Sequence, residues 1–392
     1  MTTSPPAGPH HPPTGGDGAQ DEVLGAVAAS GGTPPAAAAT AGGTRDAGDS
    51  APDAARRRPA LLLSMGPGIA GRLLDPRHHT RLAALARTDS RLVAHELADP
   101  PPAVSAALAE AEVLLTCWGA PPLTARVLDA APRLRAVVHA AGSVKHHVTD
   151  ACWERGIAVS SAAAVNALPV AEYTLAMILL ANKRVLHSAR RYRELRAPHD
   201  WQDELAAAGN YRRTVGVIGA SRIGRRVIEL LRPFGPAVLL HDPYVTAAEA
   251  ARLGVRPVSL GALCAGSDVV TVHAPQLPAT RHLLGARELA LMPDGATLIN
   301  TARGSLVDGA ALLPELVSGR LHAVLDVTEP ELPPADSPLY ELPNVLLTPH
   351  VAGSLGTELH RLTDHALDEL DRYTRGLPFT DPVHPEDLGR SA

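Results

Sequence analysis

The 392-residue sequence has few cysteines, few aromatic residues and no strong net charge. Its three cysteines, Cys117, Cys152 and Cys264, lie far apart without a C-x-x-C pair, which argues against a disulfide framework or a zinc site. The formal net charge of −5 argues against a basic surface for nucleic acid or anionic membrane. Aromatic residues make up only 3% of the chain, so the core must be built mainly from Ala, Val and Leu.

Long apolar runs are also missing. We find no uninterrupted apolar run long enough to span a bilayer, and the N-terminus lacks the basic and apolar regions of a signal peptide. We therefore expect a cytoplasmic protein without membrane or nucleic-acid partners and without a bound metal. Residues 1–57 are rich in Pro, Gly, Ala and Thr, which predicts a disordered extension, with a regulatory tail as the alternative.

Short apolar runs alternate with helix-like stretches along the rest of the chain, which predicts parallel α/β sheets, and the length favours two domains. The candidate strands are 60–65, 91–94, 113–116, 136–139, 157–160, 214–219, 237–240, 269–273, 296–301, 323–327 and 345–348. A long apolar helix is predicted over 166–180, with Pro169 in its first turn and its surface buried between domains or against a second subunit. A helix over about 357–375 is expected to pack on the first domain.

The stretch from Thr214 to Gly224 predicts the strand, tight turn and helix that begin a nucleotide-binding unit. Gly219, Ser221 and Gly224 occupy the three positions of the G-x-G-x-x-G fingerprint, with serine in the middle. Such a turn directs backbone N–H groups and the positive end of a helix at a pyrophosphate. Serine is the smallest polar substitute for glycine, and its hydroxyl can donate to a phosphate.

Asp242 ends the next apolar run, at about the twenty-residue spacing expected of the carboxylate that accepts the ribose hydroxyls of NAD. The same carboxylate would repel the extra phosphate of NADP. The sequence therefore predicts NAD as the cofactor. A chance glycine-rich turn followed by an acidic strand end is the alternative at this point.

Three segments with reactive side chains follow predicted strands, on the side where open α/β sheets bind ligands. They carry Arg303, the pair Glu329 and Glu331, and His350. An arginine can hold a carboxylate and polarise the neighbouring carbonyl, and a histidine beside a carboxylate can exchange a proton with a hydroxyl. This set suits reversible hydride transfer beside a carboxylate, with the hydride chemistry supplied by nicotinamide. Taken singly, residues of these types are more often structural or solvated than catalytic, and it is their joint occurrence after a nucleotide-binding turn that favours catalysis.

From about Val113 to Gly353 the chain resembles the D-isomer-specific 2-hydroxyacid dehydrogenase family. The shared segments are Val-Gly-Val-Ile-Gly-x-x-Arg-Ile-Gly, His-Asp-Pro-Tyr, Asn-Thr-Ala-Arg-Gly, Leu-Asp-Val, Thr-Pro-His-x-Ala-Gly and Asn-Ala-Leu-Pro-Val-Ala-Glu. The resemblance implies two doubly wound parallel-sheet α/β domains, with a Rossmann nucleotide domain inserted into a flavodoxin-like substrate domain and the active site between them. The expected boundaries are 58–165 for the first part of the substrate domain, 166–350 for the NAD-binding domain, and 351–392 for the return and the C-terminal tail.

The resemblance also implies roles for individual residues. The catalytic set falls on Arg303, Glu331 and His350, with Glu329 as the alternative acid because it precedes a proline. Backbone N–H groups of Ala141, Gly142 and Ser143 are expected to meet the substrate carboxylate together with Arg303. The residues expected to contact NAD are Gly219, Ser221, Arg222, Ile223, Gly224, Asp242, His273, Pro275, Thr301, Ala302, Arg303, Asp326, His350, Val351, Ala352 and Gly353, with Thr174 also near the nicotinamide.

One position in the expected substrate loop departs from the family pattern. The family usually has Gly-x-Gly-x-Asp where this chain has Ala-Gly-Ser-Val-Lys, so Lys145 replaces an acid. Lys145 favours a dianionic substrate, such as a phosphorylated or dicarboxylic acid, unless it is a solvated surface lysine.

Together these features predict an NAD-dependent oxidoreductase that interconverts a D-2-hydroxy acid and its 2-keto acid, as a homodimer. Phosphoglycerate-oxidising members are candidates, and no regulatory domain is expected after the closing helix. A formate-dehydrogenase-like member is disfavoured, because those proteins pair the histidine with glutamine. The alternative is an NAD(H)-sensing regulator or corepressor-like protein with little turnover, since such proteins retain the same three residues. The identity of the acid and the direction of the reaction stay open.

Overall fold

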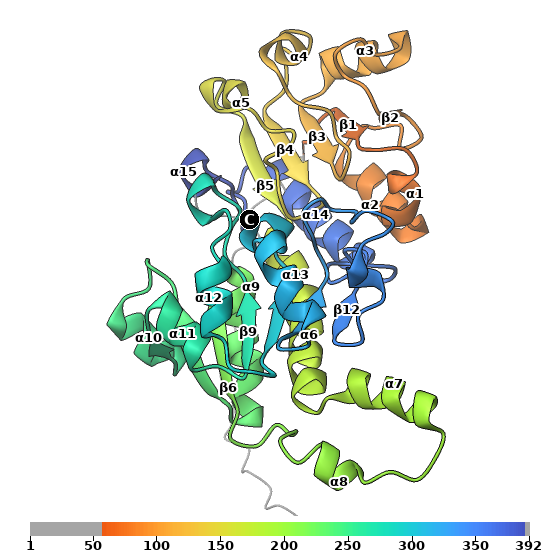
Figure 1. Cartoon of the computed structure of the whole chain (residues 1–392). Coiled ribbons are helices and arrows are strands. Elements are labelled where there is room, and N and C mark those ends of the chain that lie inside the picture. The colour runs from red at the N-terminus through yellow and green to blue at the C-terminus, as the bar shows by residue number, and fades with distance from the viewer. Residues whose placement is uncertain (1–56, 389–392) are drawn as a thin grey trace, which may run out of the picture. The chain divides into compact units, whose positions relative to one another are not determined.

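The computed structural model describes residues 57–388, except the side chain of Asp387, and contains two β-sheets with helices on both faces of each (Figure 1). All pairs of named strands are parallel. The predicted fold class, two doubly wound α/β sheets, is therefore confirmed. Residues 1–56, which make up nearly all of the predicted disordered extension, lie outside the described residues.

The first sheet has five strands in the order β2-β1-β3-β4-β5, which is the flavodoxin-like order. Its strands are β1 (Leu61–Ser64), β2 (Val93–Ala94), β3 (Val113–Thr116), β4 (Ala136–His139) and β5 (Ala158–Ser161). Its helices are α1 (Ile69–Leu73), α2 (Pro76–Leu85), α3 (Pro102–Glu110), α4 (Ala125–Asp129) and α5 (Asp150–Glu154). Because side chains alternate along a strand, Leu61 and Leu63 pack towards α1 and α2, whereas Leu62 packs towards α3 and α4.

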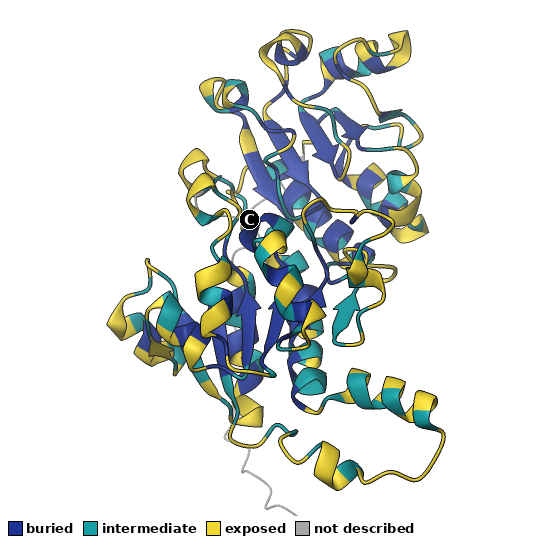
Figure 2. Cartoon of the chain, in the orientation of Figure 1, coloured by how far each residue is buried: buried dark blue, intermediate teal, exposed yellow. Residues whose placement is uncertain are grey.

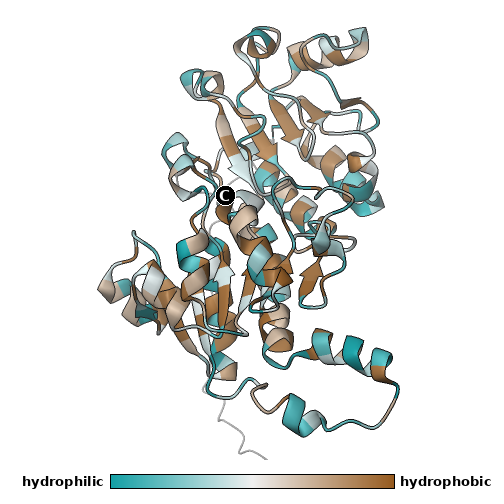
Figure 3. Cartoon of the chain, in the orientation of Figure 1, coloured by the Kyte–Doolittle hydropathy of each residue, from teal (hydrophilic) through white to brown (hydrophobic). Residues whose placement is uncertain are grey.

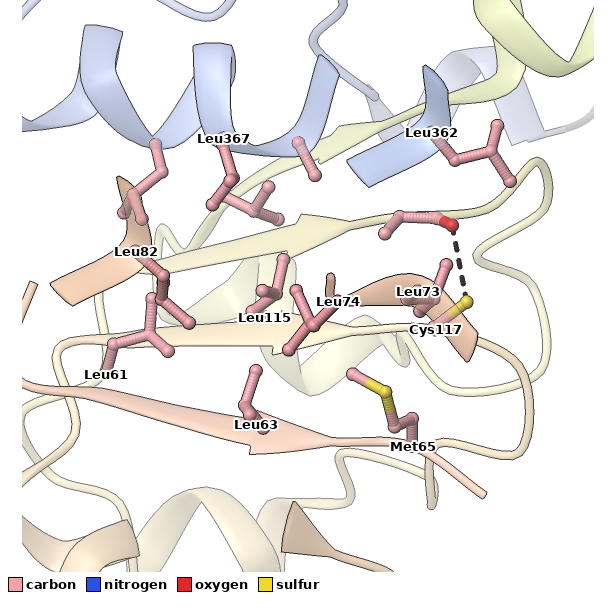
Figure 4. Packing of buried hydrophobic residues seen from close by; sticks show 14 of the residues in the cluster. Leu61, Leu63, Met65, Leu73, Leu74, Leu82, Leu115, Cys117, Leu362 and Leu367 are labelled. Carbon is pink, nitrogen blue, oxygen red and sulfur yellow. Dashed lines mark hydrogen bonds between the residues drawn. The ribbon is translucent and has the colours of Figure 1, made fainter. Parts of the chain in front are cut away.

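A helix from the end of the chain completes one face of this first sheet. Helix α14 (Glu358–Thr374) places Leu362 and Leu367 in the same buried cluster as Leu63 and Leu115 (Figure 4). The Thr363 hydroxyl donates to the carbonyl oxygen of Leu73 at 2.9 Å. One face of α14 is therefore part of the core that β1, α1 and α2 begin.

The second sheet has seven strands in the order β12-β11-β10-β9-β6-β7-β8. Its strands are β6 (Thr214–Ile218), β7 (Ala237–His241), β8 (Arg256–Pro257), β9 (Val269–Val272), β10 (Thr297–Asn300), β11 (His322–Leu325) and β12 (Val345–Leu347). Read from β8, this is the dinucleotide-binding order with one further strand. Helices α6 (Ala163–Asn182) and α9 (Arg222–Leu231) cover one face, and α11 (Leu260–Ala265), α12 (Ala286–Leu291) and α13 (Gly309–Val317) cover the other.

Both sheets have largely buried, mainly apolar central strands (Figures 2 and 3). Parallel strands that are covered on both faces need apolar side chains on both, which explains why they read as continuous apolar runs in the sequence. The remaining elements are α10 (Ala247–Leu253), α15 (Pro385–Leu388) and the 3₁₀ turns η1 (Arg232–Phe234), η2 (Pro278–Thr280), η3 (Gly304–Leu306) and η4 (Pro338–Tyr340).

Helix α6 differs from the prediction in two respects. It begins at Ala163, so Pro169 lies inside the helix rather than in its first turn. By length and composition α6 could also cross a membrane, although no such run was expected from the sequence. In the structure Ala171 and Ile178 are buried in the same cluster as Val227 and Ile228 of α9, so this face of α6 is part of the core of the second sheet.

Two further helices follow α6 in a charged stretch for which no element is predicted from the sequence. They are α7 (Val185–Leu195) and α8 (Trp201–Glu204), and neither contains a buried residue (Figure 2). Apolar side chains are nevertheless present on α7, where Leu186 is 42% and Tyr192 63% exposed.

Candidate active site

The glycine-rich turn after β6 requires glycine at two of its three fingerprint positions. Gly219 has a φ of +92°, and a Cβ there would lie 2.8 Å from the backbone nitrogen of Ala274. A Cβ on Gly224 would collide with the carbonyl oxygen of Gly219. The turn lies where the strand order reverses between β6 and β9, which is where open α/β sheets bind ligands.

Ser221 occupies the middle position without backbone strain. Its φ of −62° and ψ of 178° are extended values that any residue can adopt, and its Oγ accepts from the Gly224 N–H at 3.3 Å as the N-cap of α9. The hydroxyl hydrogen can still donate to a ligand. The first turn of this ten-residue helix directs the N–H groups of Arg222 and Ile223 outward, so the turn fits a pyrophosphate.

Asp242 follows β7 and is bonded directly to the glycine-rich turn. Its Oδ2 accepts from the Ala220 N–H at 2.7 Å, and its Oδ1 accepts from the Tyr244 N–H at 2.8 Å. Each carboxylate oxygen has a second lone pair that can accept from a ribose hydroxyl. The structure thus places the predicted acid beside the predicted phosphate-binding turn.

Arg303 lies in the loop after β10, and Asn300 fixes the shape of that loop. The Asn300 amide donates to the Arg303 carbonyl oxygen at 2.9 Å, and its Oδ1 accepts from the Ala302 N–H at 3.1 Å. Burial lowers the pKa of the Arg303 guanidinium, while Glu331 acts in the opposite direction. A Cβ on Gly304 would collide with the carbonyl group of Thr328, so this loop packs closely on the one after β11.

Asp326, at the end of β11, holds the loop that carries His350. Its side chain is buried and accepts from the Thr348 hydroxyl at 2.6 Å and from the N–H groups of Val351 at 2.8 Å and Ala352 at 2.9 Å. His350 itself has a φ of +56°, in the left-handed region that non-glycine residues rarely adopt. The buried carboxylate and this backbone conformation together fix the direction of the imidazole.

The structure pairs His350 with one of the two candidate glutamates. His350 Nδ1 lies 2.6 Å from Oε1 of Glu331, and the two side chains are 51% and 60% exposed. Glu329 lies elsewhere, with its carboxylate 2.7 Å from Arg281 and 3.4 Å from His282. Glu331 is therefore the acid that contacts the imidazole, and through its charge it also acts on Arg303.

The residues expected beside the nicotinamide lie at the same edge of the sheet. His273 is fully enclosed, with its Nε2 3.0 Å from the Thr271 hydroxyl, and burial lowers its pKa to about 3. This imidazole is therefore neutral and packs beneath the glycine-rich turn. Thr174 of α6 and Thr301 share a hydrogen bond of 3.1 Å, and the Pro275 carbonyl oxygen accepts from a threonine hydroxyl at 2.6 Å.

The expected substrate loop is joined to the His350 loop through Asn166, a contact that the sequence did not predict. Asn166 Oδ1 accepts from the Ser354 N–H at 3.1 Å. Its Nδ2 lies close to Gly142, where an added Cβ would be 3.4 Å away. The Ala141 carbonyl oxygen accepts from the Ala162 N–H at 3.0 Å. The only available signal was the position of Asn166 in the family-like segment that begins the apolar helix.

Two buried histidines lie behind the substrate loop. Thr116 Oγ1 is 2.9 Å from His139 Nδ1 and 3.2 Å from His147 Nε2. The centroids of the two imidazole rings are 4.4 Å apart. Burial lowers the pKa of His147 to about 4 and holds that of His139 well below its ordinary value. Both imidazoles are thus neutral at neutral pH. Thr116 and His139 are register partners at the ends of β3 and β4.

Comparison of this chain with known proteins identifies a family that it resembles. Residues 175–352 match the family model described as the NAD-binding domain of D-isomer specific 2-hydroxyacid dehydrogenases. A D-3-phosphoglycerate dehydrogenase of Mycobacterium bovis is 38% identical over 251 residues, which are 64% of this chain and 46% of that protein. The chain thus spans about half the length of this curated relative.

Two further proteins are covered over most of their length. A glyoxylate reductase of Korarchaeum cryptofilum is 34% identical over 65% of this chain and 77% of its own. The solved structure of an Aquifex aeolicus D-lactate dehydrogenase complexed with NAD and lactic acid is 29% identical, with a TM-score of 0.64. That match covers 81% of this chain and 96% of the other.

Proposed function

Because the chain belongs to the D-isomer specific 2-hydroxyacid dehydrogenase family, we propose that it is an NAD-dependent oxidoreductase acting on a D-2-hydroxy acid and its 2-keto acid. The observation that carries the proposal is the 2.6 Å contact between His350 and Glu331, together with the effect of the Glu331 charge on Arg303 in the loop after β10. A bound nicotinamide would supply or accept the hydride. The side chains described above bind the acid and move the proton.

Arg303 binds the substrate in this proposal. Its planar guanidinium can donate two parallel hydrogen bonds to the carboxylate at C1 and can polarise the oxygen at C2. The N–H groups of Ala141, Gly142 and Ser143 provide further donors from the opposite loop. The partial burial of Arg303 supports this role, because electrostatic attraction is stronger where water is excluded.

His350 exchanges the proton at the C2 oxygen. Its Nδ1 faces Glu331, so Nε2 is the nitrogen available to donate a proton to the forming alkoxide or to accept one from the hydroxyl. Glu331 orients the ring, because its carboxylate can only accept a hydrogen bond and therefore holds the proton on Nδ1. Glu331 is therefore a positioning residue for His350 in our proposal.

The predicted homodimer is also a proposal, and exposed apolar side chains support it. Val185, Leu186 and Tyr192 on α7, and Tyr211, are 37–81% exposed. A second copy of the chain would cover these side chains on assembly. Light scattering should give the mass of two chains, and Tyr192→Glu combined with Leu186→Asp should give that of one. A single-chain mass for the unmodified protein would contradict the proposal.

The test of function is the oxidation of NADH with glyoxylate, pyruvate, hydroxypyruvate and 3-phosphohydroxypyruvate. We expect turnover with at least one of these acids and a preference for NADH over NADPH, because Asp242 disfavours an additional phosphate. Tight NADH binding without consumption on any acid would instead indicate the NAD(H)-sensing regulator.

A further inference from the structure

The substrate loop, residues 140–146, runs between two histidines whose imidazoles contact the same hydroxyl group. His139 is the last residue of β4 and precedes the loop, and His147 follows it. His139 Nδ1 and His147 Nε2 lie 2.9 Å and 3.2 Å from Oγ1 of Thr116, which is the last residue of β3. One side chain on the neighbouring strand therefore joins the two ends of the loop.

A single hydroxyl group can bond to both imidazoles. A threonine hydroxyl donates one hydrogen bond and accepts others, and a neutral imidazole has one nitrogen that donates and one that accepts. Burial lowers the pKa of both His139 and His147, so both rings are neutral at neutral pH. Thr116 can thus donate to one ring and accept from the other. The three side chains are no more than 3% exposed, so water does not compete for these bonds.

The two ends of the substrate loop are held in different ways. At its start, the Ala140 N–H donates to the carbonyl oxygen of Thr116 at 2.8 Å, and the Cys117 thiol donates to the Ala140 carbonyl oxygen at 3.3 Å. At its end, the His147 carbonyl oxygen accepts from the N–H of Leu123, in the connection after β3, at 2.7 Å. The bond between the His147 imidazole and Thr116 ties this end to a strand of the sheet itself.

Between these ends lie the backbone N–H groups of Ala141, Gly142 and Ser143, which bind the substrate carboxylate in the proposed function. Backbone donors bind an anion well only when their directions are fixed before it arrives. Gly142 has no side chain to restrict its backbone, so the conformation of this segment depends on how firmly its ends are held.

We propose that Thr116 is a positioning residue for substrate binding, whose hydroxyl group holds the substrate loop through His139 and His147 and so directs its N–H groups at the substrate carboxylate. Thr116 is buried beneath the loop and does not itself touch the substrate. This inference rests on the proposed function of the site, and it names the buried groups that prepare the loop for the acid.

The test measures KM and kcat with whichever of glyoxylate, pyruvate, hydroxypyruvate and 3-phosphohydroxypyruvate is reduced most efficiently. Thr116→Val keeps the side-chain volume and removes the hydroxyl, whereas Thr116→Ser keeps the hydroxyl. His147→Phe keeps a ring beside His139 and removes the bond to Thr116. Thr363→Val is the matched control, because Thr363 is equally buried against the first sheet and its hydroxyl donates to Leu73 in α1.

We expect Thr116→Val to raise KM about 10-fold, as its substrate bonds weaken, and to leave kcat within about 3-fold. The Kd of NADH should not change, because the cofactor binds to loops of the second sheet. His147→Phe should also raise KM, and the double variant should raise it no more than Thr116→Val alone, since both substitutions remove the same bond. Thr116→Ser should restore most of the original KM. Thr363→Val should lower the thermal unfolding temperature without raising KM.

Three results would overturn the inference. They are an unchanged KM in Thr116→Val, a rise in KM of the same size in Thr363→Val, and multiplying effects of Thr116→Val and His147→Phe in the double variant. If thermal unfolding shows that Thr116→Val does not fold, the KM of His147→Phe decides the question, and an unchanged value rejects the inference.

The proposed function can be judged separately from this inference. Turnover by the unmodified protein leaves the proposed function standing whatever the variants show. The absence of turnover with every acid would overturn the proposed function, and this inference with it.

Discussion

The imidazole of His350 and the carboxylate of Glu331 are separated by 19 positions in the sequence, yet Nδ1 and Oε1 lie 2.6 Å apart. The two residues belong to the loops after β11 and β12, which are adjacent parallel strands. Because the carboxyl ends of adjacent parallel strands lie at one edge of the sheet, such loops meet in space. The pairing leaves Nε2 of His350 facing away from the carboxylate.

Replacement of His350 by alanine should remove turnover and leave cofactor binding nearly intact. We expect kcat/KM to fall by about 10²- to 10⁴-fold, the usual contribution of a general acid–base group. The Kd of NADH should change less than about 3-fold, which fluorescence titration can measure. His282→Ala is a matched control, because His282 is also an exposed histidine with a positive φ. Unchanged activity in His350→Ala would refute the assigned role.

The two glutamates should respond differently to substitution by glutamine. Glu331→Gln should lower the rate of keto-acid reduction by about 10- to 100-fold, because a glutamine can turn either its oxygen or its NH2 group towards Nδ1 and no longer fixes the orientation and tautomer of the imidazole. Glu329→Gln should remain within about 2-fold of the unmodified protein, since Glu329 pairs with Arg281 at the surface. The reverse result would assign the role to Glu329.

Gly224 and Ser221, two of the three fingerprint positions, should differ in how well they tolerate substitution. Gly224→Ala should abolish NADH binding or folding, because its Cβ would collide with Gly219. Ser221→Ala should lower the free energy of unfolding by about 1 kcal/mol through the lost N-cap, and Ser221→Gly by only a few tenths, on the order of 0.3 kcal/mol. Denaturant unfolding and NADH titration together measure both effects. Equal costs for alanine and glycine at position 221 would exclude a capping role.

Asp326→Asn should affect His350 through the loop that carries it. An amide can accept through only one oxygen, so at least one of the three hydrogen bonds to this buried side chain is lost. We expect a loss of about 1–3 kcal/mol in the free energy of unfolding and a fall in kcat. Asp294→Asn, whose side chain is 88% exposed, is the control. A variant with full stability and activity would show that the loop does not depend on the carboxylate.

His147 should make the protein less stable below neutral pH. Its pKa is lowered from 6.5 to about 4 in the folded protein. Above pH 6.5 both folded and unfolded states keep it neutral; as the pH falls from 6.5 to 4, only the unfolded state binds the proton, so stability falls. At about 1.4 kcal/mol for each pH unit, the loss attributable to His147 is on the order of 3 kcal/mol.

Urea unfolding of the unmodified protein and of His147→Gln at pH 7 and pH 5 would measure this contribution. The glutamine can still bond to Thr116 but does not titrate in this range, so the variant should lose less stability on acidification. Identical pH dependence in the two proteins would mean that His147 is not the group responsible.

The sequence by itself determined most of the strands and the nucleotide-binding turn. Strands β3 and β4 have the bounds that their apolar runs predict, because a strand buried on both faces is marked by its own consecutive residues. The turn from Gly219 to Gly224 could also be recognised from consecutive residues, although the need for glycine at 219 comes from a contact with Ala274 after the neighbouring strand β9. The types of reactive side chain could also be recognised, since each follows a predicted strand.

The tertiary structure alone decided which of those side chains meet. Glu331 rather than Glu329 contacts His350, and Asn166 contacts Ser354, which is 188 positions away in the sequence. Asp326, expected to contact the cofactor, is buried beneath the His350 loop and holds it. Local patterns carry no information about these contacts, because they depend on which strands are neighbours at the sheet edge and on how each loop bends after its strand ends.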